Sequence, residues 1–132
     1  MNSKAILIVG GEPNSVFSEI FFKTISSKKI NSPLILISSE KLLMKQMKKL
    51  KFNKRIKLLN YKNLQIEKIN NNSINLINID YNQKKAFEKI SKKSNKFLEK
   101  SFKVAIEILK TGKISKFING PISKKSFLNN KF

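Results

Sequence analysis

The chain has 132 residues and a formal net charge of +20, and it contains neither cysteine nor histidine. This length allows one domain with a modest core. The missing cysteines exclude disulfides and thiolate metal sites, and the missing histidines remove the commonest transition-metal ligand and the usual general base near neutral pH. Since no apolar run reaches the roughly 18 residues of a membrane span, we expect a cytoplasmic protein without a membrane partner.

The positive charge is almost entirely lysine, because Arg55 is the single arginine among 28 basic residues. Arginine is the residue that makes bidentate contacts with phosphate groups and guanine. Lysine, asparagine and isoleucine, with 27, 16 and 19 residues, make up nearly half of the chain, and A- and T-rich codons encode all three. Compositional bias therefore explains the charge at least as well as a polyanionic partner. The alternative function is that of a stand-alone basic α/β module that binds nucleic acid or another polyanion.

The first strand and helix are clear in the sequence. Residues 4–9 form an apolar, β-branched run that predicts a buried parallel strand. Asn14 or Ser15 can cap a helix that extends to about residue 29, with Glu19 near its positive end. One face of this helix is predicted to pack on the sheet, and it carries Phe17, Ile20, Phe21 and Thr24.

A second strand and helix follow. Residues 33–37 predict another apolar strand, and Ser38 or Ser39 begins a helix with one apolar face, formed by Leu43, Met47 and Leu50. Residues 54–61 can form a third strand, and the next dozen residues, which include Asn70-Asn71-Asn72, have the composition of a loop.

The last third of the chain predicts two strands around a long helix. Residues 74–80 alternate between apolar and polar, which is typical of a half-exposed strand. The helix at residues 94–110 contains a possible Glu99–Lys103 pair, ends at Gly112, and has an apolar face of Leu98, Phe102, Ala105, Ile106 and Leu109. A strand at residues 114–118 completes the alternation of strands and helices, which favours a layered α/β fold.

The first candidate ligand loop is Gly10-Gly11-Glu12-Pro13, directly after the first strand. In α/β proteins ligands bind at the carboxyl edge of the sheet, so Glu12 can present a carboxylate there. The alternative is a simple turn shaped by Gly11 and Pro13, with Glu12 in solvent.

The second candidate loop follows the last strand and contains Asn119, Gly120, Pro121 and Lys124. It has the parts of an anion site, because a glycine allows close backbone approach, a helix start offers free amides, and a lysine lies nearby. It is neither a Walker loop nor a dinucleotide fingerprint. The alternative is an ordinary connection between a strand and a short terminal helix.

In this order the two loops resemble the 4-hydroxythreonine-4-phosphate dehydrogenase family of pyridoxine biosynthesis. Residues 8–13, with Glu19 and Ile20, resemble the family's opening strand, its Gly-Glu/Asp-Pro loop and the acidic residue of its first helix. Residues 32–37 are similar to the second strand. Residues 112–124 resemble the segment in which a strand ends in a Gly-Pro loop followed by a lysine, here Lys124.

The resemblance implies a fold and an activity. The fold would be α/β, a three-layer α/β/α arrangement of the isocitrate/isopropylmalate dehydrogenase-like type, incomplete in this chain. The activity would be an NAD-dependent oxidation of 4-phosphohydroxy-L-threonine, a small phosphorylated hydroxy amino acid, with decarboxylation and with a divalent metal ion, Zn, Mg or Co. The full-length enzyme would be a homodimer.

The sequence departs from the family in two places. Residues 14–18 replace a small, glycine-rich stretch, and the His-Thr pair and metal-binding histidines that continue the family pattern are not in this chain. We therefore expect residues 1–132 to form a single amino-terminal α/β portion of a longer enzyme, marginally stable and inactive alone, with no catalytic residue and no metal ligand. The substrate-loop candidates are Glu12, Asn119, Gly120 and Lys124.

Overall fold

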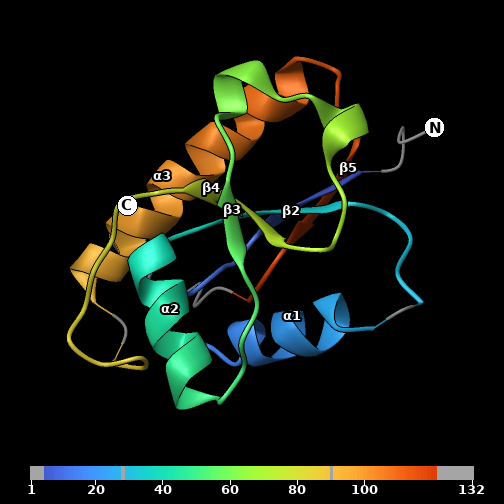
Figure 1. The fold of residues 1–132 in the computed structure, drawn as a ribbon. Helices are drawn as coiled ribbons and strands as arrows, with labels where there is room; N and C mark the ends of the chain where they lie inside the picture. The colour runs from blue at the N-terminus through green and yellow to red at the C-terminus, as the bar shows by residue number, and fades with distance from the viewer. Residues whose placement is uncertain (1–4, 28, 90, 122–132) are drawn as a thin grey trace.

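The computed structural model describes residues 5–27, 29–89 and 91–121, which form a parallel sheet between two layers of helix (Figure 1). The strands have the spatial order β3-β4-β2-β1-β5, and each neighbouring pair is parallel. In chain order they are β1 (Ile6–Val9), β2 (Leu34–Ser38), β3 (Ile56–Leu58), β4 (Ile74–Asn78) and β5 (Lys116–Asn119). The expected α/β fold is confirmed.

The helices divide between the two faces of the sheet. Helices α1 (Phe17–Ile25) and α2 (Glu40–Lys49) cover one face, and α3 (Lys92–Lys110) covers the other, together with the short 3-10 turns η1 (Tyr61–Asn63) and η2 (Ile66–Lys68) (Figure 1). Successive side chains of a strand point to opposite faces, so each strand feeds both cores. In β1, Leu7 and Val9 join the core under α3, whereas Ile8 joins the core under α1 and α2.

Strand β4 is buried on both faces, so the expectation of a half-exposed strand is wrong. It lies between β2 and β3, and Ile74, Leu76 and Ile77 are at most 1% exposed. The polar residue that produced the alternation, Asn75, is also buried. Its amide donates to the carbonyls of Leu34 at 3.1 Å and Asn70 at 2.7 Å, which satisfies the polar group inside the sheet.

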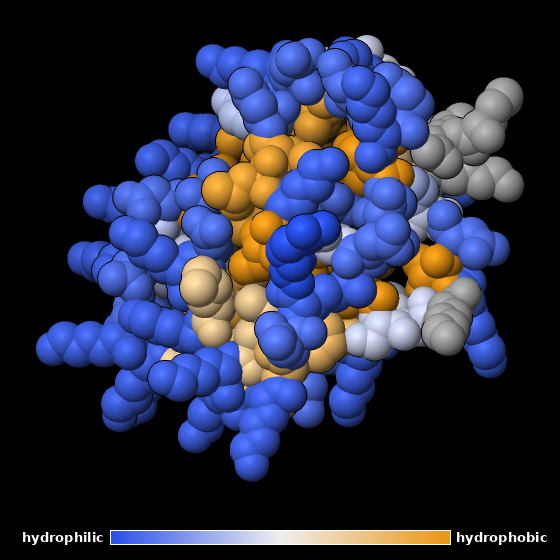
Figure 2. Space-filling model, in the orientation of Figure 1, coloured by the Kyte–Doolittle hydropathy of each residue, from blue (hydrophilic) through white to orange (hydrophobic). Residues whose placement is uncertain are grey.

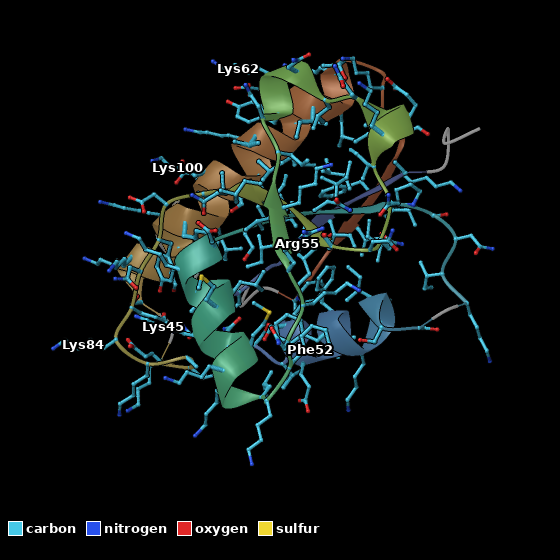
Figure 3. The ribbon with its side chains drawn as sticks, in the orientation of Figure 1. Lys45, Phe52, Arg55, Lys62, Lys84 and Lys100 are labelled. Atoms are coloured by element: carbon cyan, nitrogen blue, oxygen red, sulfur yellow. The ribbon has the colours of Figure 1, made fainter. Side chains whose placement is uncertain are left out.

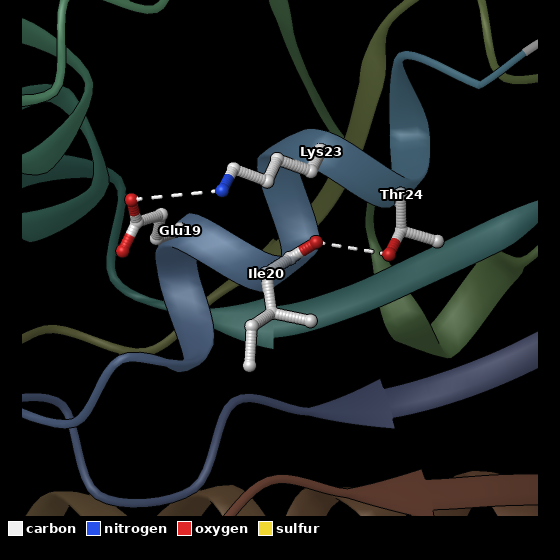
Figure 4. A network of polar contacts seen from close by, with 4 residues as sticks. All are labelled: Glu19, Ile20, Lys23 and Thr24. Atoms are coloured by element: carbon white, nitrogen blue, oxygen red, sulfur yellow. Dashed lines mark hydrogen bonds and ion pairs between the residues drawn. The ribbon is translucent and has the colours of Figure 1, made fainter.

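Helix α1 is shorter than its sequence pattern predicts. It begins after Val16, which makes no side-chain cap, so neither Asn14 nor Ser15 is the N-cap. Its buried residues are Ser18, Phe21, Phe22 and Ile25, and Ile20, expected on the buried face, is 54% exposed. The exposed side carries the Glu19–Lys23 ion pair at 3.9 Å and a hydrogen bond from the Thr24 hydroxyl to the Ile20 carbonyl (Figure 4).

Helix α3 begins two residues earlier than predicted, because Ser91 and Ser94 form a reciprocal capping box. The Glu99–Lys103 pair is confirmed at 3.7 Å, and Gly112 follows the helix with a φ of +77°. Ile106 is 51% exposed, so it is not on the buried face. That face is formed by Leu98, Ser101, Ala105 and Ile108. Its two small residues let the helix lie close to the sheet.

Strand β5 forms an exposed edge of the sheet. Among the described residues it pairs with β1 alone, and all four of its residues are exposed. Phe117 and Ile118 are 36% and 50% exposed. An exposed apolar edge strand can recruit another strand, either from the same protein or from a neighbour.

The N-cap of α2 gives a direct test of the fold. The Ser39 hydroxyl accepts from the Leu42 amide at 3.2 Å and donates to the Tyr81 carbonyl at 2.6 Å, which joins α2 to the segment after β4. We expect Ser39→Ala to lower the free energy of unfolding by about 2–3 kcal/mol, because it removes a cap and leaves a buried carbonyl unpaired. Urea unfolding measures the loss.

A matched control is Ser26→Ala, since the Ser26 hydroxyl only donates to the Phe22 carbonyl within its own helix end. This change should cost less than about 1 kcal/mol. Equal losses in the two variants would contradict the role given to Ser39.

Candidate functional site

The two candidate loops meet at one edge of the sheet. Strands β1 and β5 are parallel neighbours with Val9 opposite Asn119, so both loops leave the carboxyl edge side by side. The Gly120 amide donates to the Val9 carbonyl at 2.8 Å, and the Glu12 amide donates to the Pro121 carbonyl at 2.7 Å. Segments about a hundred residues apart in sequence thus form one structural unit.

Two glycines make this contact possible. Gly11 has a φ of +75°, and a Cβ there would lie 2.5 Å from the carbonyl carbon of Gly120. A Cβ at Gly120 would lie 2.4 Å from the Gly10 carbonyl oxygen. Any side chain at either position would collide with backbone, which cannot move aside without separating the loops. The sequence attributed to Gly120 a close approach to an anion, whereas in the structure the backbone of the neighbouring loop makes this close approach.

The Glu12 side chain points into the protein. It is only 5% exposed, so the alternative of a solvated Glu12 is wrong. Its Oε1 accepts from the backbone amide of Asn14 at 3.2 Å and from the Asn14 side-chain amide at 3.4 Å. Burial raises the pKa of this carboxyl above 4.5, and hydrogen bonds from Asn14 and the Ser94 hydroxyl counteract part of the rise.

A polar network holds the Glu12 loop against other elements. Asn14 Oδ1 accepts from the side-chain amide of Gln83 at 2.6 Å and from the backbone amide of Glu88 at 2.8 Å. The Tyr81 hydroxyl donates to Gln83 Oε1 at 2.7 Å. From α2, Gln46 Nε2 donates to the Pro13 carbonyl at 2.7 Å. The network fixes the loop after β1 between α2 and the segment that precedes α3.

Sequence reasoning missed this network. Residues 81–88 have no regular periodicity, and asparagine and glutamine side chains in such a segment resemble ordinary loop composition. A signal was present only in Gln46, a polar residue on the apolar side of α2 that proves to be 2% exposed. A buried amide of this kind needs partners, and it finds them in neighbouring loops.

The other candidate residues lie at the outer end of β5. Asn119 is exposed, and its side-chain amide donates to the Gly120 carbonyl at 3.1 Å. Gly120 is buried beneath the neighbouring loop. Lys124 and the expected terminal helix lie outside the described residues. The structure therefore brings Glu12, Asn119 and Gly120 together, with the carboxyl of Glu12 directed inward and the amide of Asn119 at the surface.

A wider groove lies at the carboxyl ends of β2 and β4. It has a volume of about 500 Å³ and is lined by Tyr81, Phe97, two carboxylates and five lysines, including Lys96 and Lys100. The connection after β2 passes to the α2 face, whereas the connection after β4 passes to the α3 face. Ligands of open α/β sheets often bind where the connections diverge in this way.

Metal and membrane features were sought in residues 5–27, 29–89 and 91–121. In these ranges no group of three or more aspartates and glutamates is arranged to hold a metal ion. None of the helices in the same ranges is long and apolar enough to cross a membrane.

The fold and the paired loops define a layered α/β protein whose candidate ligand loops lie at the carboxyl edge of a parallel sheet. Solved 4-hydroxythreonine-4-phosphate dehydrogenases have this fold. The enzyme from Burkholderia phymatum superimposes with a TM-score of 0.80 and 17% identity, over 96% of this chain and 39% of its own. A putative 4-hydroxythreonine-4-phosphate dehydrogenase from Salmonella typhimurium superimposes with a TM-score of 0.81 and 20% identity. The match covers 97% of this chain and 40% of that protein.

A third structure, the dehydrogenase from Klebsiella pneumoniae, gives a TM-score of 0.78 and 12% identity, over 96% of this chain and 39% of its own. The chain thus spans about two fifths of the length of these proteins. No family model and no curated protein sequence matches it. The expected three-layer fold class is confirmed, as an incomplete version of the fold in these larger chains.

The contact between the loops predicts an unusual sensitivity at Gly120. We expect Gly120→Ala to destabilise the chain by about 2–3 kcal/mol, because its Cβ meets the Gly10 carbonyl and must push the loops apart. The control is Gly112→Ala, where a Cβ meets nothing within 4 Å and only the positive φ opposes it. That change should cost about 1 kcal/mol. Thermal unfolding compares the two, and a larger loss at Gly112 would contradict the packing described here.

The buried carboxyl of Glu12 predicts a pH dependence. Its pKa is raised in the folded state, so the folded chain keeps this proton to higher pH than the unfolded chain. The contribution to stability is therefore largest below pH 4.5 and is lost as the pH rises through the raised pKa. We expect Glu12→Gln to remove this loss of stability. As the pH rises through the raised pKa of Glu12, the melting temperature of the variant should therefore increase relative to that of the natural chain.

The control for the pH series is Glu107→Gln, which removes an exposed carboxylate from α3. The groups that interact electrostatically with Glu12 include Tyr81, whose own pKa is raised by burial first and then by the charges of Glu12 and Glu88. Tyr81 titrates far above the range tested. Identical pH profiles for the two variants would show that Glu12 is not the source of the effect.

Proposed function

We propose that this chain is the amino-terminal portion, residues 1–132, of a dehydrogenase that oxidises 4-phosphohydroxy-L-threonine with NAD and a divalent metal ion in pyridoxine biosynthesis. The observation that carries the proposal is the contact between the Gly10–Pro13 and Asn119–Pro121 loops at the carboxyl edge of β1 and β5. Its support is the fold, which is shared with three solved chains named 4-hydroxythreonine-4-phosphate dehydrogenase.

In this proposal the two loops have different tasks. The exposed amide of Asn119 and the ammonium of Lys124 bind the phosphorylated end of the substrate, because both can donate hydrogen bonds to phosphate oxygens. Gly120 allows the β5 loop to lie on the β1 loop. Glu12 acts as a positioning residue beneath them, since its side chain is 5% exposed and its backbone amide holds Pro121.

The metal and the chemical step belong to the remainder of the proposed enzyme. The described residues offer no metal-binding cluster, and the sequence contains no histidine or cysteine, so the residues present do not fit a catalytic metal centre. We therefore assign the metal ligands, the catalytic residues and the NAD contacts to residues outside this chain. The complete enzyme is proposed to be a cytoplasmic homodimer.

Binding of nucleic acid or another polyanion is the competing function. Its strongest support is the lysine-lined groove at the ends of β2 and β4. Against it, hydrophilic side chains project along most of the outline of the face drawn in Figure 2. Lys62, Lys84 and Lys100 all project on the left side of the view in Figure 3. The exposed Lys23, however, is on α1, which covers the opposite face of the sheet from α3. A nucleic-acid footprint concentrates cations on one face, so this spread favours compositional bias.

The assay uses the intact gene product with 4-phosphohydroxy-L-threonine, NAD and added Zn²⁺, Mg²⁺ or Co²⁺. We expect NADH to form, a chelator to stop it, and the 132-residue chain alone to be inactive. Lys124→Ala should raise KM at least about tenfold, because a hydrogen bond to a charged group contributes about 1.5–3 kcal/mol. Lys110→Ala, at the exposed end of α3, is the control. Calorimetry that detects neither NAD nor substrate binding would rule out the proposal.

A further inference from the structure

Asn119 and Gly120 form the single Asn-Gly pair of the chain, although it contains 16 asparagines. Asparagine is a thermolabile residue, because the backbone nitrogen of the next residue can attack its side-chain carbonyl carbon. The attack is least hindered when the next residue is glycine, which has no Cβ and adopts many backbone conformations. Asn119 is also exposed, so water can reach its side-chain amide. Sequence and exposure together make Asn119 chemically vulnerable.

The fold opposes this attack in two ways. The Gly120 amide donates to the Val9 carbonyl at 2.8 Å, and Gly120 is buried, so the proton that the attacking nitrogen must lose is held inside the protein. Asn119 is the last residue of β5, where the backbone is extended. The cyclic product can form only if the backbone turns so that the Gly120 nitrogen lies over the side chain. Both obstacles disappear when β5 separates from β1.

We propose that Asn119 is a deamidation site that the pairing of β5 with β1 keeps unreactive. When the two strands separate, the Gly120 nitrogen forms a bond with Cγ of Asn119. The bond between Cγ and Nδ2 breaks, and ammonia leaves with the amide proton of Gly120. Water then opens the cyclic imide at either carbonyl and leaves aspartate or isoaspartate at position 119. No electrons are transferred, and water is the only co-reactant.

The product changes the contact between the loops. The side-chain amide of Asn119 donates to the Gly120 carbonyl at 3.1 Å, and a carboxylate in its place is an acceptor that cannot make this hydrogen bond. Isoaspartate also lengthens the backbone between the residue opposite Val9 and Gly120, so the loops cannot return to the same register. If the proposed function holds, the reaction also replaces a phosphate-binding donor with a negative charge.

Peptide mapping by mass spectrometry measures the reaction. The protein is incubated at mildly alkaline pH, once folded and once in urea. We expect deamidation at Asn119 to be at least about tenfold slower in the folded sample, because only the locally opened fraction reacts. Folding should slow the reaction far less at Asn31, an exposed asparagine in the connection before β2. Equal rates at Asn119 in the two samples, or equal protection of Asn31, would overturn the proposal.

Two glycine variants test whether strand pairing is the cause. A Cβ at Gly11 would lie 2.5 Å from the carbonyl carbon of Gly120, so Gly11→Ala should push the loops apart. We expect it to raise the rate at Asn119 at least about fivefold, because such overpacking weakens the contact. Gly112→Ala, where a Cβ meets nothing within 4 Å, should leave the rate unchanged. A folded Gly11→Ala variant with the natural rate, or an equal increase in Gly112→Ala, would overturn the proposal.

A measurement on the natural sequence covers the case in which Gly11→Ala fails to fold. Hydrogen exchange of the Gly120 amide and deamidation of Asn119 both require the Gly120–Val9 hydrogen bond to break. In increasing urea below the unfolding transition, the two rates should therefore rise together. Deamidation that accelerates without faster exchange at Gly120 would overturn the proposal. Mass and exchange are read without any assay of dehydrogenase activity, so this test is independent of the proposed function.

Discussion

The parallel pairing of β1 with β5 is the constraint on which the candidate site depends. It brings together two loops from opposite ends of the described chain, with Val9 opposite Asn119. Ordering so long an intervening segment costs conformational entropy, which only a well-packed sheet and its helices can offset. Gly11 and Gly120 then allow backbone to touch backbone, and the Glu12 amide holds the Pro121 carbonyl across the contact.

The inward carboxyl of Glu12 gives the first loop its rigidity. A buried carboxyl is unfavourable unless hydrogen bonds satisfy it, and here Asn14 supplies two of them to one oxygen. Asn14 is itself held by Gln83, which connects the loop to the segment before α3. A loop fixed in this way presents its backbone in one conformation.

The large positive charge affects the stability of the chain and is a separate matter from the candidate site. Lysines occur on helices, turns and connecting segments, as Lys45, Lys62 and Lys84 illustrate (Figure 3). A charge of +20 on a chain of 132 residues produces self-repulsion that opposes compaction. The exposed apolar edge at Phe117 and Ile118 adds a second unfavourable feature. Both features are in line with the prediction that this chain alone is marginally stable.

Local patterns in the sequence were enough to predict the α/β fold, a cap at Ser38 or Ser39, the stop at Gly112, and the two loops. Each of these depends on residues close together in the chain: β-branched runs form strands, a serine satisfies the first turn of a helix, and a glycine accepts a positive φ. The pattern also placed Gly120 directly after a strand, whereas Asn119, expected after it, is the last residue of β5. The contact between the two loops cannot be predicted from the sequence of either loop alone.

The tertiary structure alone decided which residues are buried. Strand β4 became an inner strand because β3 pairs on its far side, so Asn75 is buried although its pattern predicts an exposed face. Ile20 and Ile106 remain exposed because the helices turn other faces to the sheet. Glu12 is enclosed by residues distant in sequence, Gln83 among them through Asn14. Burial depends on contacts between segments far apart in the chain, which a local pattern does not specify.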